Sequence, residues 1–211
     1  MRIAVFGAGG SVGSRTVAEA AARGHKVLAI ARKRLAGLPG NAETRIGDVT
    51  DTAAVERLSG EADVVISAVR PPQGLEHQQA AATKTLLDGV APTGTRLLIV
   101  GGAATLRVPD TGGLVMDDPR YVQAPWRAIA AAGAEQHEVC RGEKRVDWVY
   151  VSPSANLVPG ERTGRYRIGG DELLTDEQGD SRISVEDLAV ALIDEAESPR
   201  HHRTRFTVAA A

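Results

Sequence analysis

The chain has 211 residues, of which 43% are hydrophobic and 25% are charged, the proportions of an ordinary globular domain. Its formal net charge of −2 gives no general attraction to nucleic acid or to an anionic membrane. No apolar run approaches the roughly 20 residues that a membrane span needs. The single cysteine, Cys140, excludes an intramolecular disulfide and fits a cytoplasmic setting. We therefore expect a cytoplasmic protein that binds a small molecule, without nucleic-acid or membrane partners, as a monomer or weak homodimer.

Predicted strands and helices alternate along most of the chain, and the apolar runs and glycine boundaries give their limits. In chain order the pattern predicts a strand at 2–6, a helix at 11–23, strands at 26–30 and 44–46, a helix at 53–58, a strand at 63–67, a helix at 78–90, a strand at 96–100, a helix at 125–141, a strand at 146–151, a helix from Ser184 to about Glu197, and a strand at 205–208. Such alternation is typical of an α/β fold of Rossmann type, with a doubly wound parallel sheet.

The regular alternation of predicted strands and helices ends after Pro153. The stretch from Pro159 to Gly170 is rich in Gly and Arg and has no helical period. We interpret it as part of a small C-terminal lobe on the substrate side. The prediction is one domain over residues 1–211, with a dinucleotide-binding core at 1–151 and a substrate-side extension at 152–211.

A glycine-rich loop joins the first predicted strand to the first predicted helix. Gly7 would permit the tight turn, Gly10 would let the backbone approach a pyrophosphate, and Gly13 would allow the helix to pack closely on the strand. The N–H groups and the helix dipole at Ser11 and Val12 would then face the phosphates. The alternative is a strand-to-helix turn without a ligand, but the complete βαβ context favours dinucleotide binding.

The end of the second predicted strand bears on which dinucleotide is bound. An acidic residue there would hold the ribose hydroxyls of NAD, whereas this chain has Ala31-Arg32-Lys33-Arg34. Because an Arg can bind a 2′-phosphate in bidentate fashion, Arg32 and Lys33 favour NADP(H) over NAD(H). The alternative is a solvated basic strand end.

Several further motifs add to the glycine loop, and together they cover nearly the whole chain. They are Gly7-x-x-Gly10-x-x-Gly13, Gly24-His25-x-Val27, Arg32, Gly47-Asp48-Val49-Thr50-Asp51, Asp63-Val64-Val65-Ile66-Ser67-Ala68, Val100-Gly101-Gly102-Ala103, Trp148-x-Tyr150-Val151-Ser152-Pro153, Pro159-Gly160-Glu161-Arg162-Thr163-Gly164-x-Tyr166-Arg167 and Ile183-Ser184-x-Glu186-Asp187. On these residues the chain resembles the atypical short-chain dehydrogenases/reductases, in particular their NAD(P)H-binding NADH-flavin reductase subgroup. That subgroup is similar to biliverdin-IXβ/flavin reductase and to NmrA-like proteins.

The resemblance implies positions for the rest of a bound dinucleotide. Asp48 and Val49 would lie near the adenine, although Asp48 could instead be a structural carboxylate at a helix start. Ser67, Ala68 and Val69 would border the nicotinamide ribose, although Ser67 could equally be a hydrogen-bonded strand-end hydroxyl. The nicotinamide end would be lined by Gly101, Gly102 and Pro153.

The catalytic pair of ordinary short-chain dehydrogenases, a Tyr followed four residues later by a Lys, is absent. Tyrosines 121, 150 and 166 are followed at that spacing by Pro125, Ser154 and Gly170. Without that pair the proton donor for a carbonyl substrate is missing. A flavin acceptor removes the difficulty, since hydride can pass between two rings that the protein holds face to face.

Residues of the extension are candidates for contacts with the acceptor. Ser152, Ser154 and Asn156 could hydrogen-bond a substrate or cap their own loop, and Arg165 with Tyr166 could bind an anionic, planar molecule or lie on a solvated hairpin. No catalytic residue follows from the sequence, and Ser154 and Tyr166 are the candidates for a proton donor.

Three other side chains are interpreted structurally. His137 lies on a predicted helix without a second ligand at metal spacing, so we expect it at the surface and expect no metal site. Trp126 and Trp148 are scarce aromatic residues that we expect in the core.

The sequence therefore predicts an NADPH-dependent oxidoreductase that transfers hydride to a flavin or another planar acceptor. Two alternatives stay open: a non-catalytic NADP(H)-sensing regulator of NmrA-like type, and the reduction or isomerisation of another metabolite with Tyr166 or a serine as proton donor.

Overall fold

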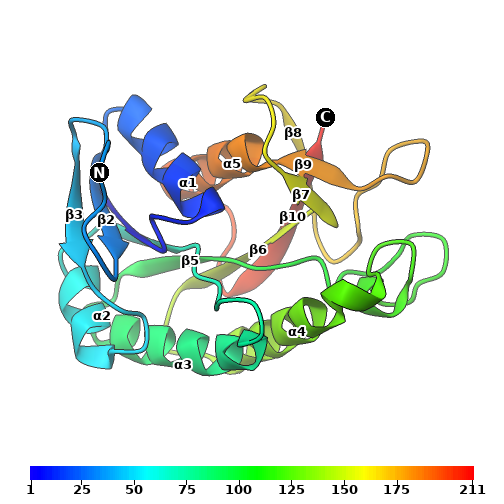
Figure 1. Cartoon of the computed structure of the whole chain (residues 1–211), viewed down its shortest axis with the longest axis horizontal. Helices are drawn as coiled ribbons and strands as arrows, with labels where there is room; N and C mark the ends of the chain where they lie inside the picture. The colour runs from blue at the N-terminus through cyan, green and yellow to red at the C-terminus, as the bar shows by residue number, and fades with distance from the viewer.

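The computed structural model describes residues 1–211 and shows one large sheet between two layers of helices (Figure 1). The sheet has eight strands in the order β3-β2-β1-β4-β5-β6-β10-β8, all parallel to their neighbours except β8. The strands are β1 (Arg2–Phe6), β2 (Lys26–Ala31), β3 (Ala42–Ile46), β4 (Val64–Ser67), β5 (Arg96–Val100), β6 (Trp148–Pro153), β7 (Asn156–Val158), β8 (Tyr166–Gly169), β9 (Arg182–Ser184) and β10 (Thr204–Ala210). The helices are α1 (Ser11–Ala22), α2 (Thr52–Ser59), α3 (Gln79–Val90), α4 (Arg127–Gly142) and α5 (Val185–Glu197). The predicted Rossmann-type fold is confirmed.

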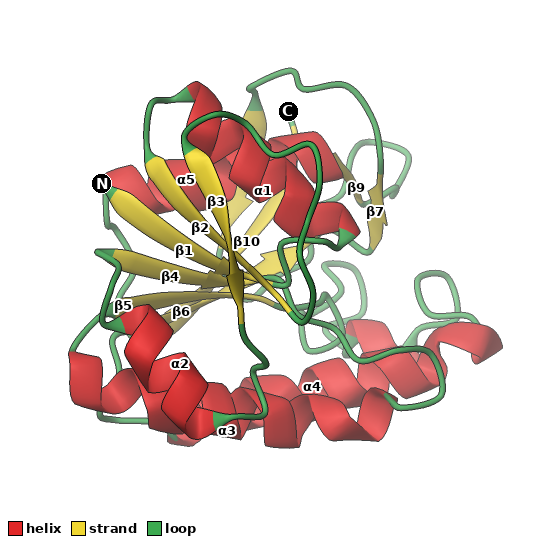
Figure 2. Cartoon of the chain, turned by 60° about the vertical axis from the view of Figure 1, so that its left-hand side comes forward, coloured by secondary structure: helices red, strands yellow, loops and turns green.

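The two layers of helices cover opposite faces of the sheet. Figure 2 shows α1 and α5 on one face and α2, α3 and α4 on the other. Alternate residues of β1 supply both cores, because successive side chains of a strand point to opposite faces. Ile3 and Val5 pack with α1 and α5, whereas Ala4 and Phe6 pack with α2 and α3. A strand buried on both faces is therefore apolar almost throughout, as its sequence shows.

Two helix starts are fixed by side-chain caps. Asp51 Oδ1 accepts a hydrogen bond of 3.1 Å from the Ala54 amide at the start of α2. Ser184 Oγ accepts one of 2.9 Å from the Asp187 amide at the start of α5, where the sequence predicted a capped helix. The predicted helix at 125–141 begins later, at Arg127, because Ala124–Trp126 form a separate 3₁₀ turn.

The predicted extension at 152–211 contributes directly to the main fold. Helix α5 packs against α1, and β10 lies beside β6 in the large sheet. Only the short pair β7 and β9 stands apart, and neither strand was predicted, since three residues are too few to show an alternating pattern. A small third core joins the segment after β5 to Leu173 of the extension; it comprises Leu106, Val108, Val115, Val122 and Leu173.

Two of the structural interpretations were wrong. Trp126 is 58% exposed in the turn before α4, whereas Trp148 is buried at 3% as expected. His137 is buried at 8%, with Nδ1 3.2 Å from Thr105 Oγ1 and its ring against Tyr150. Burial lowers the pKa of His137 to about 4, so the ring is neutral at pH 7.

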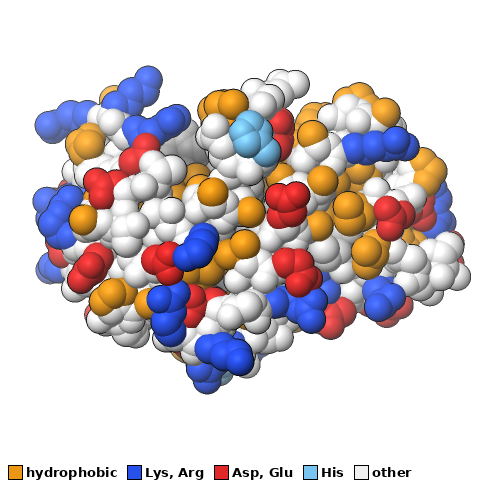
Figure 3. Space-filling view, turned by 90° about the horizontal axis from the view of Figure 1, so that it is seen from below, with side chains coloured by type: hydrophobic (Ala, Val, Ile, Leu, Met, Phe, Trp, Pro, Cys, Tyr) orange, Lys and Arg blue, Asp and Glu red, His pale blue; other side chains and the backbone are white.

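The face formed by α3 and α4 carries no extended region of one charge. Figure 3 shows acidic and basic side chains interspersed across it, with hydrophobic side chains more frequent at the right-hand end. None of the helices combines the length and the apolar character that crossing a bilayer requires.

Candidate dinucleotide-binding site

The turn between β1 and α1 has a backbone that only glycine satisfies at two positions. Gly7 has φ of +79°, and a Cβ there would lie 2.6 Å from the Ala68 carbonyl oxygen. A Cβ at Gly13 would lie 2.1 Å from the Gly7 carbonyl oxygen. Neither neighbour can move, because both are backbone. The turn is therefore packed against the end of β4 and under the first turn of α1, as the glycine pattern requires.

The start of α1 presents donors rather than a protein cap. Gly10 is the N-cap residue, no side chain caps the helix, and the first turn contains no acidic residue. Gly10 and Ser11 are exposed, and Val12 is half-buried. Because the first amides of a helix lack partners within the helix and carry its positive pole, they form a site for an anion. The positions of Gly7, Gly10, Ser11, Val12 and Gly13 thus fit a pyrophosphate.

The end of β2 lies next to this turn in the sheet, since β1 and β2 are paired in register. Arg32 and Lys33 are exposed immediately after β2, and neither side chain forms an ion pair within the protein. Leu35, which sequence reasoning did not single out, reaches back over the turn, and its Cδ2 lies 3.1 Å from where a Gly9 Cβ would be. Its amide donates to Thr44 Oγ1, which holds this loop on β3.

The two residues expected near the adenine differ in their surroundings. Asp48 Oδ1 accepts hydrogen bonds from the Thr50 amide and hydroxyl, at 3.0 and 2.9 Å, so this carboxylate also stabilises its own turn. Val49 is buried at 8% in the core beneath α2.

The end of β4 is held by a side chain that the sequence pattern did not reveal. Ser67 is buried, while Ala68 and Val69 are half-buried beside the glycine turn. Gln79 Nε2 donates to the Val69 carbonyl at 3.2 Å, and the other amide atom of this buried side chain, Oε1, has no hydrogen-bond partner. An unpaired acceptor beside the expected ribose position is consistent with a ligand that carries hydroxyl groups.

The end of β5 rests on Tyr150. A Cβ at Gly101 would lie 2.0 Å from Tyr150 Cζ, and the Gly102 amide donates to Tyr150 Oη at 3.3 Å. Tyr150 Oη is also 3.1 Å from the Gly133 carbonyl and 3.2 Å from Gln136 Oε1. Burial raises the pKa of Tyr150, so the hydroxyl stays protonated and fixes the Gly101-Gly102 turn.

The candidates on and after β6 are mostly covered by protein. Ser152 is fully buried, Pro153 is buried, and Ser154 is 3% exposed with its hydroxyl donating to the Val208 carbonyl at 2.9 Å. Asn156 is exposed. In this structure the Ser154 hydroxyl is used within the protein, whereas the buried Ser152 Oγ has no hydrogen-bond partner. Their roles as substrate contacts, and that of Ser154 as a proton donor, stay predictions.

Tyr166 and the arginines around it lie on the α1 and α5 face. Tyr166 Oη donates to Asp194 of α5 at 2.5 Å, and burial together with this carboxylate raises the pKa of the phenol. Arg165 is exposed, but its neighbour Arg162 forms two hydrogen bonds with Glu19 of α1, at 2.7 and 2.8 Å. The structure therefore places the Tyr166 hydroxyl on a carboxylate of α5, and its role as a proton donor stays a prediction.

The geometry defines a nucleotide-binding α/β protein, and comparison with known proteins gives the family. Residues 7–199 match the pattern of the family described as NAD(P)H-binding, so the chain belongs to that family. The match begins at Gly7, the first glycine of the turn.

Similar proteins cover almost the whole chain. The uncharacterized protein YwnB of Bacillus subtilis is 33% identical, over 99% of this chain and 98% of its own length. A solved structure from Bacteroides thetaiotaomicron, provisionally called an epimerase, is 38% identical with a TM-score of 0.90, over 99% of this chain and 96% of its own. A structure from Streptococcus pneumoniae, provisionally called an NADH-flavin reductase, is 29% identical with a TM-score of 0.85, over all of both chains. The chain is thus an NAD(P)H-binding, oxidoreductase-like protein.

Proposed function

We propose that this protein uses NADPH to reduce a flavin or another planar acceptor. The observation that carries the proposal is the state of the three tyrosines, the residue type that usually donates the proton in this class. Tyr121 Oη donates to the Gly179 carbonyl at 3.1 Å, Tyr150 Oη lies beneath the Gly101-Gly102 turn, and Tyr166 Oη is bound to Asp194. With every phenol engaged elsewhere, a reaction that needs no proton from the protein is favoured.

The residues of the carboxyl edge bind and orient in this proposal. The first amides of α1 hold the pyrophosphate, Arg32 and Lys33 hold the 2′-phosphate, and the Gly101-Gly102 turn lines the nicotinamide end. When bound, the reduced nicotinamide supplies a hydride, and the solvent supplies the proton that completes reduction. The protein contributes chiefly by holding two rings in a reactive arrangement.

Stopped-flow oxidation of NADPH tests the proposal. With FMN, FAD or a quinone as acceptor, the protein is expected to accelerate the loss of NADPH absorbance well above the rate without protein. The Gly13→Ala variant, whose new Cβ would collide with the Gly7 carbonyl, is the matched control and is expected to be inactive. No acceleration with any of these acceptors would refute the proposal.

A non-catalytic sensor of NADP(H) is the second candidate, because the same engagement of all three phenols is expected of a protein without chemistry. Calorimetry separates the two functions. A sensor is expected to bind one oxidation state much more tightly than the other and to turn over nothing. We propose a cytoplasmic setting, where NADPH is available, and a monomer or weak homodimer.

A further inference from the structure

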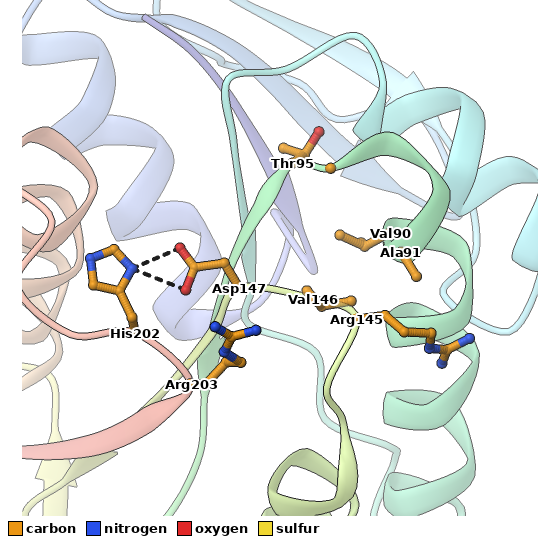
Figure 4. Close-up of a pocket in the computed structure, with 9 residues that line it drawn as sticks. Val90, Ala91, Thr95, Arg145, Val146, Asp147, His202 and Arg203 are labelled. Carbon is orange, nitrogen blue, oxygen red and sulfur yellow. Dashed lines mark hydrogen bonds and ion pairs between the residues drawn. The ribbon is translucent and has the colours of Figure 1, made fainter.

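A pocket of about 270 Å³ opens at the opposite edge of the sheet from the glycine turn (Figure 4). It lies where β5, β6 and β10 begin, beside the end of α3. The lining residues are Val90, Ala91, Gly94, Thr95, Arg145, Val146, Asp147, His202 and Arg203. A parallel strand of five residues spans about 16 Å, so this pocket and the dinucleotide site are separate.

The lining contains two guanidinium groups, those of Arg145 and Arg203, and one carboxylate, that of Asp147. Asp147 is already engaged, because its Oδ2 lies 2.9 Å from His202 Nδ1 (Figure 4). Arg145 pairs with Asp88 and Glu143 outside the pocket.

Arg203 is the lining cation without a counter-ion. Its guanidinium makes one hydrogen bond, of 3.3 Å, to the Lys144 carbonyl, and it takes part in no ion pair. The pocket is therefore lined by one guanidinium that forms no ion pair with a protein carboxylate.

The backbone of Arg203 is strained, which adds an independent observation. With φ of +48°, it is the one non-glycine residue of the chain in the left-handed region. Glycine or asparagine would adopt this conformation more easily. Strain of this kind persists where the surrounding structure enforces it, and it is concentrated at binding sites. Here the strained residue is the one whose unpaired guanidinium lines the pocket.

A second guanidinium, that of Arg96, lies beside the pocket and is paired with Glu195 and Asp147. Arg96 is 8% exposed, and its Nε and one terminal nitrogen have no hydrogen-bond partner, with Nε 3.8 Å from Asp147 Oδ2. Its other terminal nitrogen is bound to Glu195 and to the His201 carbonyl. The carboxyl end of α3 carries the negative pole of the helix dipole, which disfavours an anion. One of its carbonyls, that of Val90, accepts a hydrogen bond of 2.7 Å from the Thr93 hydroxyl.

We propose that this pocket binds a phosphate-sized oxyanion, with the guanidinium of Arg203 as its principal ligand. The cavity of about 270 Å³ has room for a phosphate group and a small organic part beside it, and a guanidinium matches the phosphate in charge and geometry. Free phosphate and a small phosphate monoester share this chemistry.

Thermal unfolding at constant ionic strength, with inorganic phosphate titrated against chloride, tests the proposal. At about ten times the dissociation constant, phosphate is expected to raise Tm by about 3–6 °C. The Arg203→Asn variant keeps a residue that tolerates the left-handed backbone but lacks the cation, and its Tm is expected not to respond. A general stabilising effect of phosphate would raise both proteins equally, which would overturn the proposal.

The Arg32→Ala variant distinguishes this site from the dinucleotide site. Its Tm is expected to respond to phosphate as the wild type does, whereas loss of the response would assign phosphate to the dinucleotide site and refute the proposal.

Amide chemical shifts of the wild type give a check that needs no variant. Phosphate is expected to move Gly94 and Thr95, and shifts confined to Gly10 and Ser11 would contradict the proposal. Tighter binding of glycerol phosphate than of inorganic phosphate would indicate that the ligand is an organic phosphate.

Discussion

The basic residues after β2 and those between β7 and β9 look alike in the sequence but have different surroundings in the fold. Arg32 and Lys33 extend into solvent without an acidic partner, whereas Arg162 binds Glu19 and Arg167 donates to the carbonyls of Ala210 and Thr175. The first set is available to an anionic ligand, and the second is used to hold the chain together. A run of cations therefore indicates a binding site only once the positions of the nearby acids are known.

The contact between Arg162 and Glu19 shows why the second set is structural. Glu19 is 6% exposed on α1, and it also pairs with Arg23, which bridges to Asp194 and Glu197 of α5. The hydrogen bonds from Arg162 hold the pKa of Glu19 below its usual value, although burial works against them. The loop before β8 is in this way fastened to the helix that begins at the glycine turn.

The largest effect is expected from a change in the geometry of the turn, on which the availability of the first set depends. Gly13→Ala places a Cβ 2.1 Å from the Gly7 carbonyl, and such overpacking costs about 1–3 kcal/mol. Calorimetry is expected to show no NADPH binding. Gly133→Ala is the control, because its Cβ meets nothing within 4 Å in α4, and it is expected to add about 0.5–1 kcal/mol of stability. Normal NADPH affinity in Gly13→Ala would contradict the assignment of the turn.

Removing one cation of the first set is expected to have the next largest effect. Arg32→Ala is expected to weaken NADPH binding by about 1–3 kcal/mol and to leave NADH binding and Tm unchanged, since Arg32 has no partner within the protein. Isothermal titration with both nucleotides measures the difference. An equal loss for NADPH and NADH would show that Arg32 does not bind the 2′-phosphate.

For the second set we expect a loss of stability and no change in NADPH affinity. Arg162→Ala removes two hydrogen bonds from a buried carboxylate and is expected to cost about 1–2 kcal/mol of stability without changing NADPH affinity. Urea unfolding measures it. Arg165→Ala, which removes an exposed neighbour, is the control and is expected to stay within about 0.5 kcal/mol of the wild type.

The dependence of that loss on pH follows from the lowered pKa of Glu19. A carboxyl with a depressed folded pKa stabilises the protein above its unfolded pKa, and this contribution disappears as pH falls through the folded value. The difference in the free energy of unfolding between the wild type and Arg162→Ala should therefore be largest at pH 7. It should decrease as the solution is acidified below about pH 4. A gap that widened in acid would show that Arg162 stabilises the fold in another way.

The fold was predictable from the sequence because the central strands β1, β2, β4 and β5 are largely apolar and the turns between elements are marked by glycines. The glycine turn was predictable for the same reason, since Gly7 and Gly13 are needed by backbone contacts between neighbouring segments. What could not be predicted depends on distant partners. The roles of Gln79 and Tyr150 arise from hydrogen bonds to Val69 and Gly102, which lie 10 and 48 residues away.

The same limitation applies to the hydroxyl candidates at the far end of the site. Ser154 and Tyr166 follow or begin strands near the expected substrate side, but one is bound to Val208 and the other to Asp194. The burial of His137 likewise depends on Thr105 and Tyr150, which are remote in sequence. Hydroxyl and imidazole groups can serve equally as ligands or as structural donors, and only the tertiary partner decides between these roles.

The smallest effect is expected for Tyr166→Phe, which tests whether the segment that carries the second set also contains a functional residue. Losing the 2.5 Å hydrogen bond to Asp194 is expected to cost about 0.5–1.5 kcal/mol, because Arg23 still pairs with that carboxylate. Turnover of NADPH with a flavin is expected to be unchanged at every pH. A fall in kcat with unaltered stability would identify Tyr166 as a proton donor after all, and would favour the reduction or isomerisation of a metabolite. Unchanged turnover together with reduced stability would place Tyr166 with Arg162, as part of the contact that joins α5 to the loop before β8.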